Sequence, residues 1–136
     1  MPNPQNLKSF SNQSVLLLFA ILGFLIYGNT LNNDFALDDT IVITSNQYTK
    51  KGISGIPDHL TNDHFTGFYG QEKNLVSGGR YRPLSLIFFS MQYELFGEKA
   101  WIGHFCNILF YIINGFLIFL VIKQILYPLN EYSSTA

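Results

Sequence analysis

The sequence predicts an all-α membrane protein in which two transmembrane helices are joined by a long extracytoplasmic loop that carries short helices. Of the 136 residues, 48% are hydrophobic and only 12% are charged, about half the charged share of an ordinary soluble domain. The charges cluster, because 14 of the 17 lie in residues 34–99 and none lies in residues 9–33 or 100–122. The formal net charge of −1 argues against a nucleic-acid-binding protein, which would be basic.

The first apolar run predicts a transmembrane helix over residues 15–31, after a cytoplasmic N-terminus of residues 1–14. At about 1.5 Å per residue this helix nearly crosses a hydrocarbon layer of roughly 30 Å. A cleaved signal peptide is the competing interpretation, since Lys8 precedes a short apolar core. No small-x-small cleavage site follows Tyr27, so an uncleaved signal anchor is favoured.

The second apolar run predicts a transmembrane helix over residues 100–122, flanked by Trp101 and Tyr127 as interfacial aromatic residues would be. Lys8 precedes the first span and residues 32–49 contain no Lys or Arg, which places the N-terminus in the cytoplasm. The tail, residues 123–136, then also faces the cytoplasm. The loop, residues 32–99, is expected in the periplasm or the lumen. The single cysteine, Cys106, excludes an intrachain disulfide.

A third apolar stretch, residues 84–96, follows Pro83 and ends before Gly97, the usual punctuation of a helix. It is too short to span a membrane and suits a helix at the membrane surface or against other helices.

The second span also carries a polar stripe. Its members recur at steps of three and four and so share one helix face: His104, Asn107, Tyr111 and Asn114. Such residues either join helices by hydrogen bonds or line a functional site. Both interpretations require partners beyond membrane lipid, namely further carboxy-terminal helices or other membrane chains.

Adjacent carboxylates, Asp38 and Asp39, stand near the start of the loop. One carboxylate could accept a proton while the other orients that carboxylate. Alternatively, either could cap a short helix that begins at Thr40. Asp58-His59 and Asp63-His64 offer potential metal ligands, but their spacing matches no familiar zinc pattern and also suits a solvated loop.

Two arginines stand at the Tyr81-Arg82-Pro83 turn: Arg82 is part of the turn and Arg80 directly precedes it. Arginine binds phosphate with two parallel hydrogen bonds, so a lipid-phosphate headgroup is a natural ligand. A general contact with anionic lipid explains the same residues equally well.

Five motifs in this order resemble one family. They are Asp38-Asp39-x-x-x-Ile43-x-x-Asn46, Thr61-Asn62-Asp63-x-Phe65, Tyr81-Arg82-Pro83-Leu84-Ser85, Leu95-Phe96-Gly97 and His104-x-x-Asn107. The chain is similar, over residues 15 to about 122, to the GT-C glycosyltransferases related to protein O-mannosyltransferases. The transmembrane and tetratricopeptide-repeat mannosyltransferases and their bacterial relatives are the nearest in pattern.

The resemblance implies a membrane enzyme that transfers a mannose-like sugar, with inversion, from a polyprenyl-phosphate donor to an acceptor hydroxyl. It implies that Asp38 accepts the hydroxyl proton and that Asp39 orients either the acceptor or its neighbour Asp38, while the chemistry of Arg82 suits the donor phosphate. It implies no cofactor beyond the lipid-linked sugar, and a divalent metal has no support in the residues. Relatives usually carry a second histidine where Tyr111 stands here, which makes a catalytic role for that helix face less favourable.

Relatives have many more spans, so this chain is expected to be the N-terminal part of a GT-C-type bundle, a fragment inactive alone. The rival hypothesis is a small non-catalytic membrane protein that binds a partner through the polar face of its second helix.

The expected topology can be tested with single cysteines at Ser54 or Ser77 in a Cys106→Ala background. Both should react with a membrane-impermeant maleimide added outside intact cells, because the loop is expected outside the cytoplasm. Labelling that requires permeabilised cells would place the loop in the cytoplasm and would exclude the catalytic interpretation.

Overall fold

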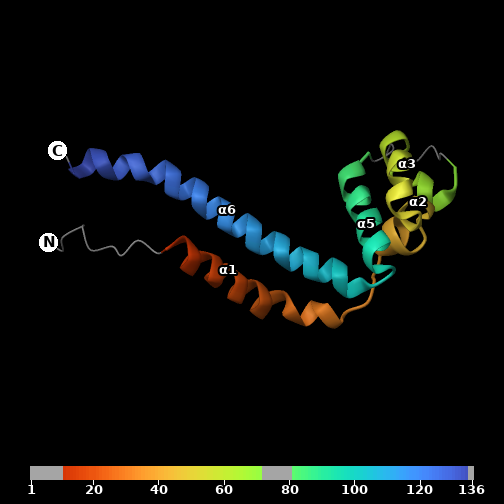
Figure 1. The fold of residues 1–136 in the computed structure, drawn as a ribbon, viewed down its shortest axis with the longest axis horizontal. Coiled ribbons are helices and arrows are strands. Elements are labelled where there is room, and N and C mark those ends of the chain that lie inside the picture. The colour runs from red at the N-terminus through yellow and green to blue at the C-terminus, as the bar shows by residue number, and fades with distance from the viewer. Residues whose placement is uncertain (1–10, 72–80, 135–136) are drawn as a thin grey trace. The chain divides into compact units, whose positions relative to one another are not determined.

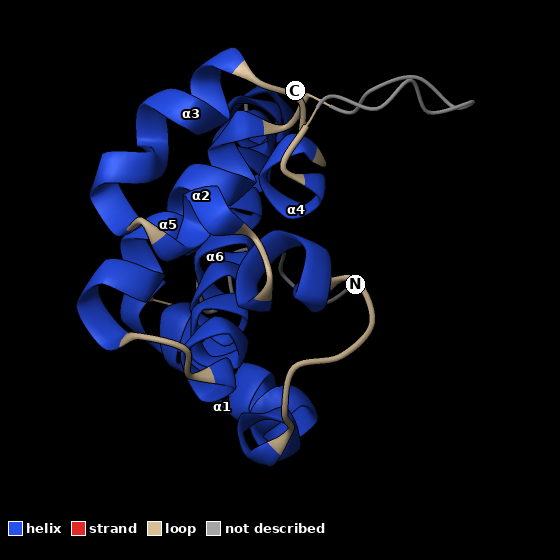
Figure 2. Ribbon diagram, turned by 90° about the vertical axis from the view of Figure 1, so that its right-hand side faces the viewer, coloured by secondary structure: helices blue, strands red, loops and turns tan. Residues whose placement is uncertain are grey.

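The computed structural model describes residues 11–71 and 81–134, with side chains described as far as residue 126. These residues form helices joined by short loops, with no strand among them (Figure 2). They divide into two compact units: the first contains residues up to Asn29 and from Cys106 onward, and the second contains Thr30–Phe105. The all-helical fold class is therefore confirmed for the described part of the chain.

Two helices make the first unit. Helix α1, Asn12–Tyr27, starts at Ser11, whose side chain accepts a hydrogen bond from the Ser14 amide; a 3₁₀ helix, Gly28–Asn32, continues it. Helix α6 is Ala100–Ser134. It extends past the expected end at residue 122, because Lys123, Gln124 and Leu126 are good helix formers and a helix need not stop where the apolar run does.

Both helices are long and apolar enough to cross a membrane. The candidate spans are Asn12–Asn32 and Ala100–Leu126, with mean hydropathies of 2.0 and 2.4, and only 11% of each apolar window is buried within the protein. A core helix of a soluble protein would be mostly buried, so the exposed surfaces of these helices suit lipid or further helices.

In the first unit α1 and α6 lie side by side and antiparallel (Figure 1). Near one end Lys123 Nζ donates to Asn12 Oδ1 at 2.9 Å. Near the other end the rings of Tyr27 and Tyr111 meet edge to face, with centroids 5.3 Å apart. Between these contacts Gly115 of α6 lies against the ring of Phe19, and the small residue lets the two backbones approach closely.

The second unit is built around helix α5, Pro83–Phe96, which begins with proline and ends at Gly97 with φ +70°, as predicted. Short elements pack on it: a π-helix Thr40–Thr44, α2 Gln47–Lys50, a 3₁₀ helix Gly52–Gly55 and α3 Ile56–Thr61, followed by α4 Thr66–Tyr69, which packs on α2 and the π-helix. The buried apolar residues of this unit are few, namely Val42, Leu86 and Ile102.

Replacement of Gly115 by alanine should loosen the helix pair. The new Cβ would lie 2.7 Å from two ring carbons of Phe19, and such overpacking typically costs about 1–3 kcal/mol. Thermal unfolding in detergent, followed by circular dichroism, should show a lower midpoint for Gly115→Ala. Gly28→Ala is the matched control because nothing lies within 4 Å of its added Cβ, and equal midpoints for the two variants would exclude this close approach.

Candidate functional site

The acidic pair follows a strained residue. Leu37 has φ +48°, a left-handed conformation that leucine rarely adopts, and 93% of its surface is exposed. The turn is closed on its other side by Asp39, whose Oδ2 accepts a hydrogen bond from the Ala36 amide at 2.9 Å. Asp38, which follows Leu37 in this turn, is exposed.

The alternative prediction, that the side chain of one of these aspartates caps a short helix beginning at Thr40, is wrong. A short helix does begin after the pair, but it is a π-helix, and the Asp39 side chain makes no capping hydrogen bond to it. The main-chain carbonyl of Asp38 accepts from the Ile41 and Val42 amides instead. The carboxylate of Asp38 is exposed and has no hydrogen-bond or ion-pair partner within the described residues.

The segment after the acidic pair is held by the fully buried side chain of Asn46. Its Oδ1 accepts from the amides of Tyr48 and Thr49 at 3.0 and 3.1 Å, and its Nδ2 donates to the Ile41 carbonyl at 3.0 Å. Gly67 of α4 packs directly on this side chain, where a Cβ would clash. Asn46 therefore joins the π-helix, α2 and α4.

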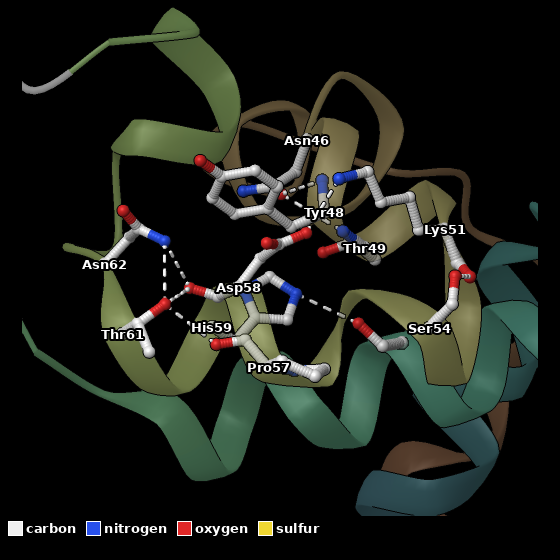
Figure 3. A network of polar contacts seen from close by, with 11 residues as sticks. Asn46, Tyr48, Thr49, Lys51, Ser54, Pro57, Asp58, His59, Thr61 and Asn62 are labelled. Carbon is white, nitrogen blue, oxygen red and sulfur yellow. Dashed lines mark hydrogen bonds and ion pairs between the residues drawn. The ribbon is translucent and has the colours of Figure 1, made fainter.

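A second buried contact joins α3 to α5. His59 is only 2% exposed, and its Nε2 lies 3.0 Å from Oγ of Ser90, which is fully buried. The ring of Tyr48 contacts the imidazole edge to face, with centroids 5.7 Å apart. Figure 3 shows the imidazole of His59 near Tyr48 within this polar network.

Burial lowers the pKa of His59, because the charged imidazolium loses its hydration. The negative charge of Asp58 opposes that shift, and His64 adds to it. His59 is thus held neutral by its surroundings and supports the fold, since neither it nor Ser90 is open to a substrate.

The carboxylates near the two histidines have structural partners. Asp58 accepts from Lys51 Nζ at 2.7 Å, and Asp63 Oδ1 accepts from the Phe65 amide at 2.9 Å. No group of three or more histidine, cysteine, aspartate or glutamate side chains that could hold a metal ion occurs in residues 11–71 or 81–126. His59 faces Ser90, and the two acid-histidine pairs do not assemble into a metal centre there.

The basic turn is described only in part. Arg80 lies outside the described residues, whereas Arg82 is exposed directly before α5. Its neighbour Tyr81 donates from its hydroxyl to the Leu60 carbonyl at 2.8 Å, which anchors the turn to α3. The guanidinium of Arg82 makes no ion pair with any described side chain.

The structure does not bring the polar stripe of α6 together as one interacting group. Asn114 is exposed and donates to the Phe110 carbonyl of its own helix at 3.0 Å. Tyr111 packs on Tyr27, and Asn107 is exposed. His104 is half-buried and belongs to the second unit, whereas the other three belong to the first.

Sequence reasoning did not identify the buried polar residues that hold the second unit together as structural, although Asn46 stands in one of the motifs. Asn46 carries a readable signal, because asparagine before a short helical stretch is a typical N-cap. Thr49 and Ser90 carry none, since a single small polar residue in an apolar context has no distinctive spacing. Their burial depends on the folded arrangement, in which Thr49 Oγ1 donates to the Val42 carbonyl and Ser90 contacts His59 of a segment 31 residues away.

Two known proteins match this chain in sequence. The protein O-mannosyl-transferase tmtc2 of Xenopus laevis is 34% identical over 95 residues, which cover 68% of this chain and 11% of the relative. The protein O-mannosyl-transferase Tmtc1 of Drosophila melanogaster is 31% identical over 106 residues, covering 77% of this chain and 12% of the relative. No model of a protein family and no solved structure matches the chain.

The chain therefore resembles protein O-mannosyltransferases over most of its own length, as its motifs predicted. It spans only about a ninth of the length of these relatives. The candidate membrane spans agree with a membrane protein.

The neutral state of His59 predicts how the second unit responds to acid. Its pKa is lowered in the folded state and lies near 6.5 in an unfolded chain, so the unfolded chain binds the proton first. Stability should be complete above about pH 6.5 and should fall as the pH drops toward the folded-state pKa, by at most about 1.4 kcal/mol per pH unit.

Hydrogen exchange of the Thr49 and Ser90 amides between pH 7 and pH 5, corrected for the intrinsic pH dependence of exchange, measures this loss. In a His59→Gln variant the unit should be weaker at pH 7 but less sensitive to pH. An unchanged pH dependence in that variant would show that His59 is not the source of the effect.

Proposed function

We propose that this chain is the segment of a membrane glycosyltransferase that carries the general base, and that Asp38 is that base. One observation carries the proposal. Of the adjacent carboxylates, Asp38 is exposed and unpartnered among the described residues, whereas Asp39 is bonded to the Ala36 amide. A general base must be open to the proton that it accepts, and Asp38 meets that requirement more fully than the half-exposed Asp39.

The proposed substrates are a sugar linked to a polyprenyl phosphate and a hydroxyl group of an acceptor. Asp38 accepts the hydroxyl proton while the acceptor oxygen forms a bond to the anomeric carbon. The bond from that carbon to the phosphate oxygen breaks, and the lipid phosphate leaves with the electron pair. Attack opposite the leaving group inverts the configuration, and the sugar is mannose-like by similarity to the relatives.

The second carboxylate and the arginine have supporting roles in this proposal. Asp39 fixes the turn through Ala36 and so orients Asp38 and the acceptor. Arg82 is exposed at the start of α5 and can neutralise the phosphate as its charge grows, with Arg80 as a second candidate. The loop that contains these residues lies in the periplasm or lumen, and both ends of the chain lie in the cytoplasm.

A second candidate function rests on α6. Asn107 and Asn114 are exposed on a helix long enough to span a membrane, where exposed amides favour contact with another helix. A non-catalytic protein that binds a membrane partner through this face would retain the helix pair and would not need the strained turn at Leu37. Carboxylate substitutions would then leave its activity in cells unchanged.

The base assignment can be tested with three matched substitutions, Asp38→Asn, Asp39→Asn and Asp34→Asn. Each removes one carboxylate charge from the same segment with little change in shape. Loss of a general base typically lowers a rate on the order of 10²- to 10⁴-fold, so Asp38→Asn should lower transfer to that extent. Asp39→Asn should cost less, and Asp34→Asn should remain near the unsubstituted rate.

The assay measures transfer from a polyprenyl-phosphate sugar in membranes. It is run with residues 1–136 alone, where no transfer is expected, and with the chain co-expressed with carboxy-terminal helices of a relative. Near-native rates for all three variants would exclude Asp38 as the base and favour the partner-binding candidate. Turnover by the isolated chain would show that the segment needs no further helices.

A further inference from the structure

A small cavity lies inside the second unit, next to the π-helix that follows the acidic pair. Its walls include Ile43 of the π-helix, Phe89 and Gln92 of α5, and Ile102 and Gly103 at the start of α6. About 20 Å³ is open to the centre of a water molecule. A site needs about 10–15 Å³ of such volume to hold one water, so this cavity can hold one and is too small for a larger ligand.

One wall of the cavity carries a polar group without a partner. Nε2 of Gln92 is buried and makes no hydrogen bond to any described residue. Its neighbours in the cavity wall include the apolar side chains of Phe89 and Ile102. A buried amide that lacks an acceptor is unfavourable, and buried polar groups in proteins are nearly always satisfied by protein or by ordered water.

We propose that this cavity binds one ordered water molecule, whose oxygen accepts a hydrogen bond from Nε2 of Gln92. A buried water normally makes two to four hydrogen bonds. Tyr93 and Gly97 line the cavity, and their main-chain carbonyls are the acceptors that we propose for its protons. Each carbonyl already accepts one bond, from Gly97 and Lys99 respectively, and each oxygen has a second lone pair.

The position of this water gives it a structural effect on the candidate site. Phe35, which precedes the acidic pair, and Ile43, which follows it, both line the cavity. The proposed partners of the water lie on α5 and at Gly97, so the water fills the space next to Phe35 and Ile43 without bonding to their side chains. It supports the packing of the segment that carries Asp38, whether or not that residue is a catalytic base.

Nuclear magnetic resonance of the full chain in lipid nanodiscs tests the proposal directly. The protein is labelled with ¹⁵N-glutamine. The side-chain amide protons of Gln92 should then show a dipolar cross-peak to water, and the sign of that cross-peak should be the one typical of a long-lived contact. Gln47 is exposed and serves as the control, for which only the signal of fast surface water is expected. A Gln92 amide with no water contact, or with only the surface type, would overturn the proposal.

A substitution gives a second and independent test through the direction of its effect. Gln92→Leu removes the amide that holds the water, so exchange of the buried Ile102 amide should become about fivefold to tenfold faster, the usual effect of losing one hydrogen bond. If the amide were instead unpaired, its removal would relieve a penalty, and exchange would be slower or unchanged. Gln47→Leu should leave the Ile102 amide unaffected.

Discussion

The side chain of Asn46 connects the elements that surround the acidic segment. It accepts two main-chain hydrogen bonds at the start of α2 and donates one to the Ile41 carbonyl of the π-helix, while α4 packs on it through Gly67. A buried amide left without such partners would be strongly unfavourable. The hydrogen bonds therefore specify a single arrangement for a unit whose apolar core is small.

The hydrogen bonds of Asn46 stabilise the fold, whereas the backbone conformation of the acidic turn destabilises it. Leu37 is held at a positive φ, a conformation that costs of order 1–3 kcal/mol, and surrounding contacts must offset that cost. The Asp39 contact to Ala36 and the Asn46 contact to Ile41 lie on either side of the pair. A turn constrained from both ends can keep Asp38 exposed in one place, and fixed placement of a base contributes to catalysis.

The parts of the fold that follow from local chemistry could be predicted from the sequence. Both apolar runs and the Pro83-to-Gly97 helix are helices as expected, because residue pattern and end signals act over a few positions. The π-helix, the pairing of His59 with Ser90 and the left-handed Leu37 could not be predicted. The pairing of His59 with Ser90 joins segments 31 residues apart, whereas the π-helix and Leu37 have uncommon backbone conformations that the residue pattern does not indicate. The motifs at Asp38 and Asn46 marked this segment without showing its geometry.

The polar residues of the loop fall into two groups, those that are buried and hydrogen-bonded and those that are exposed. Those that are buried, such as Asn46, Thr49 and His59, satisfy hydrogen bonds and hold helices together. Asp38 and Arg82 are exposed, and the described residues supply neither with an ion pair. A polar residue that only stabilises a fold gains by being buried and paired, whereas one that acts on a substrate must stay accessible. Asp38 and Arg82 are among the motif residues that remain accessible, and their chemistry suits accepting a proton and binding a phosphate.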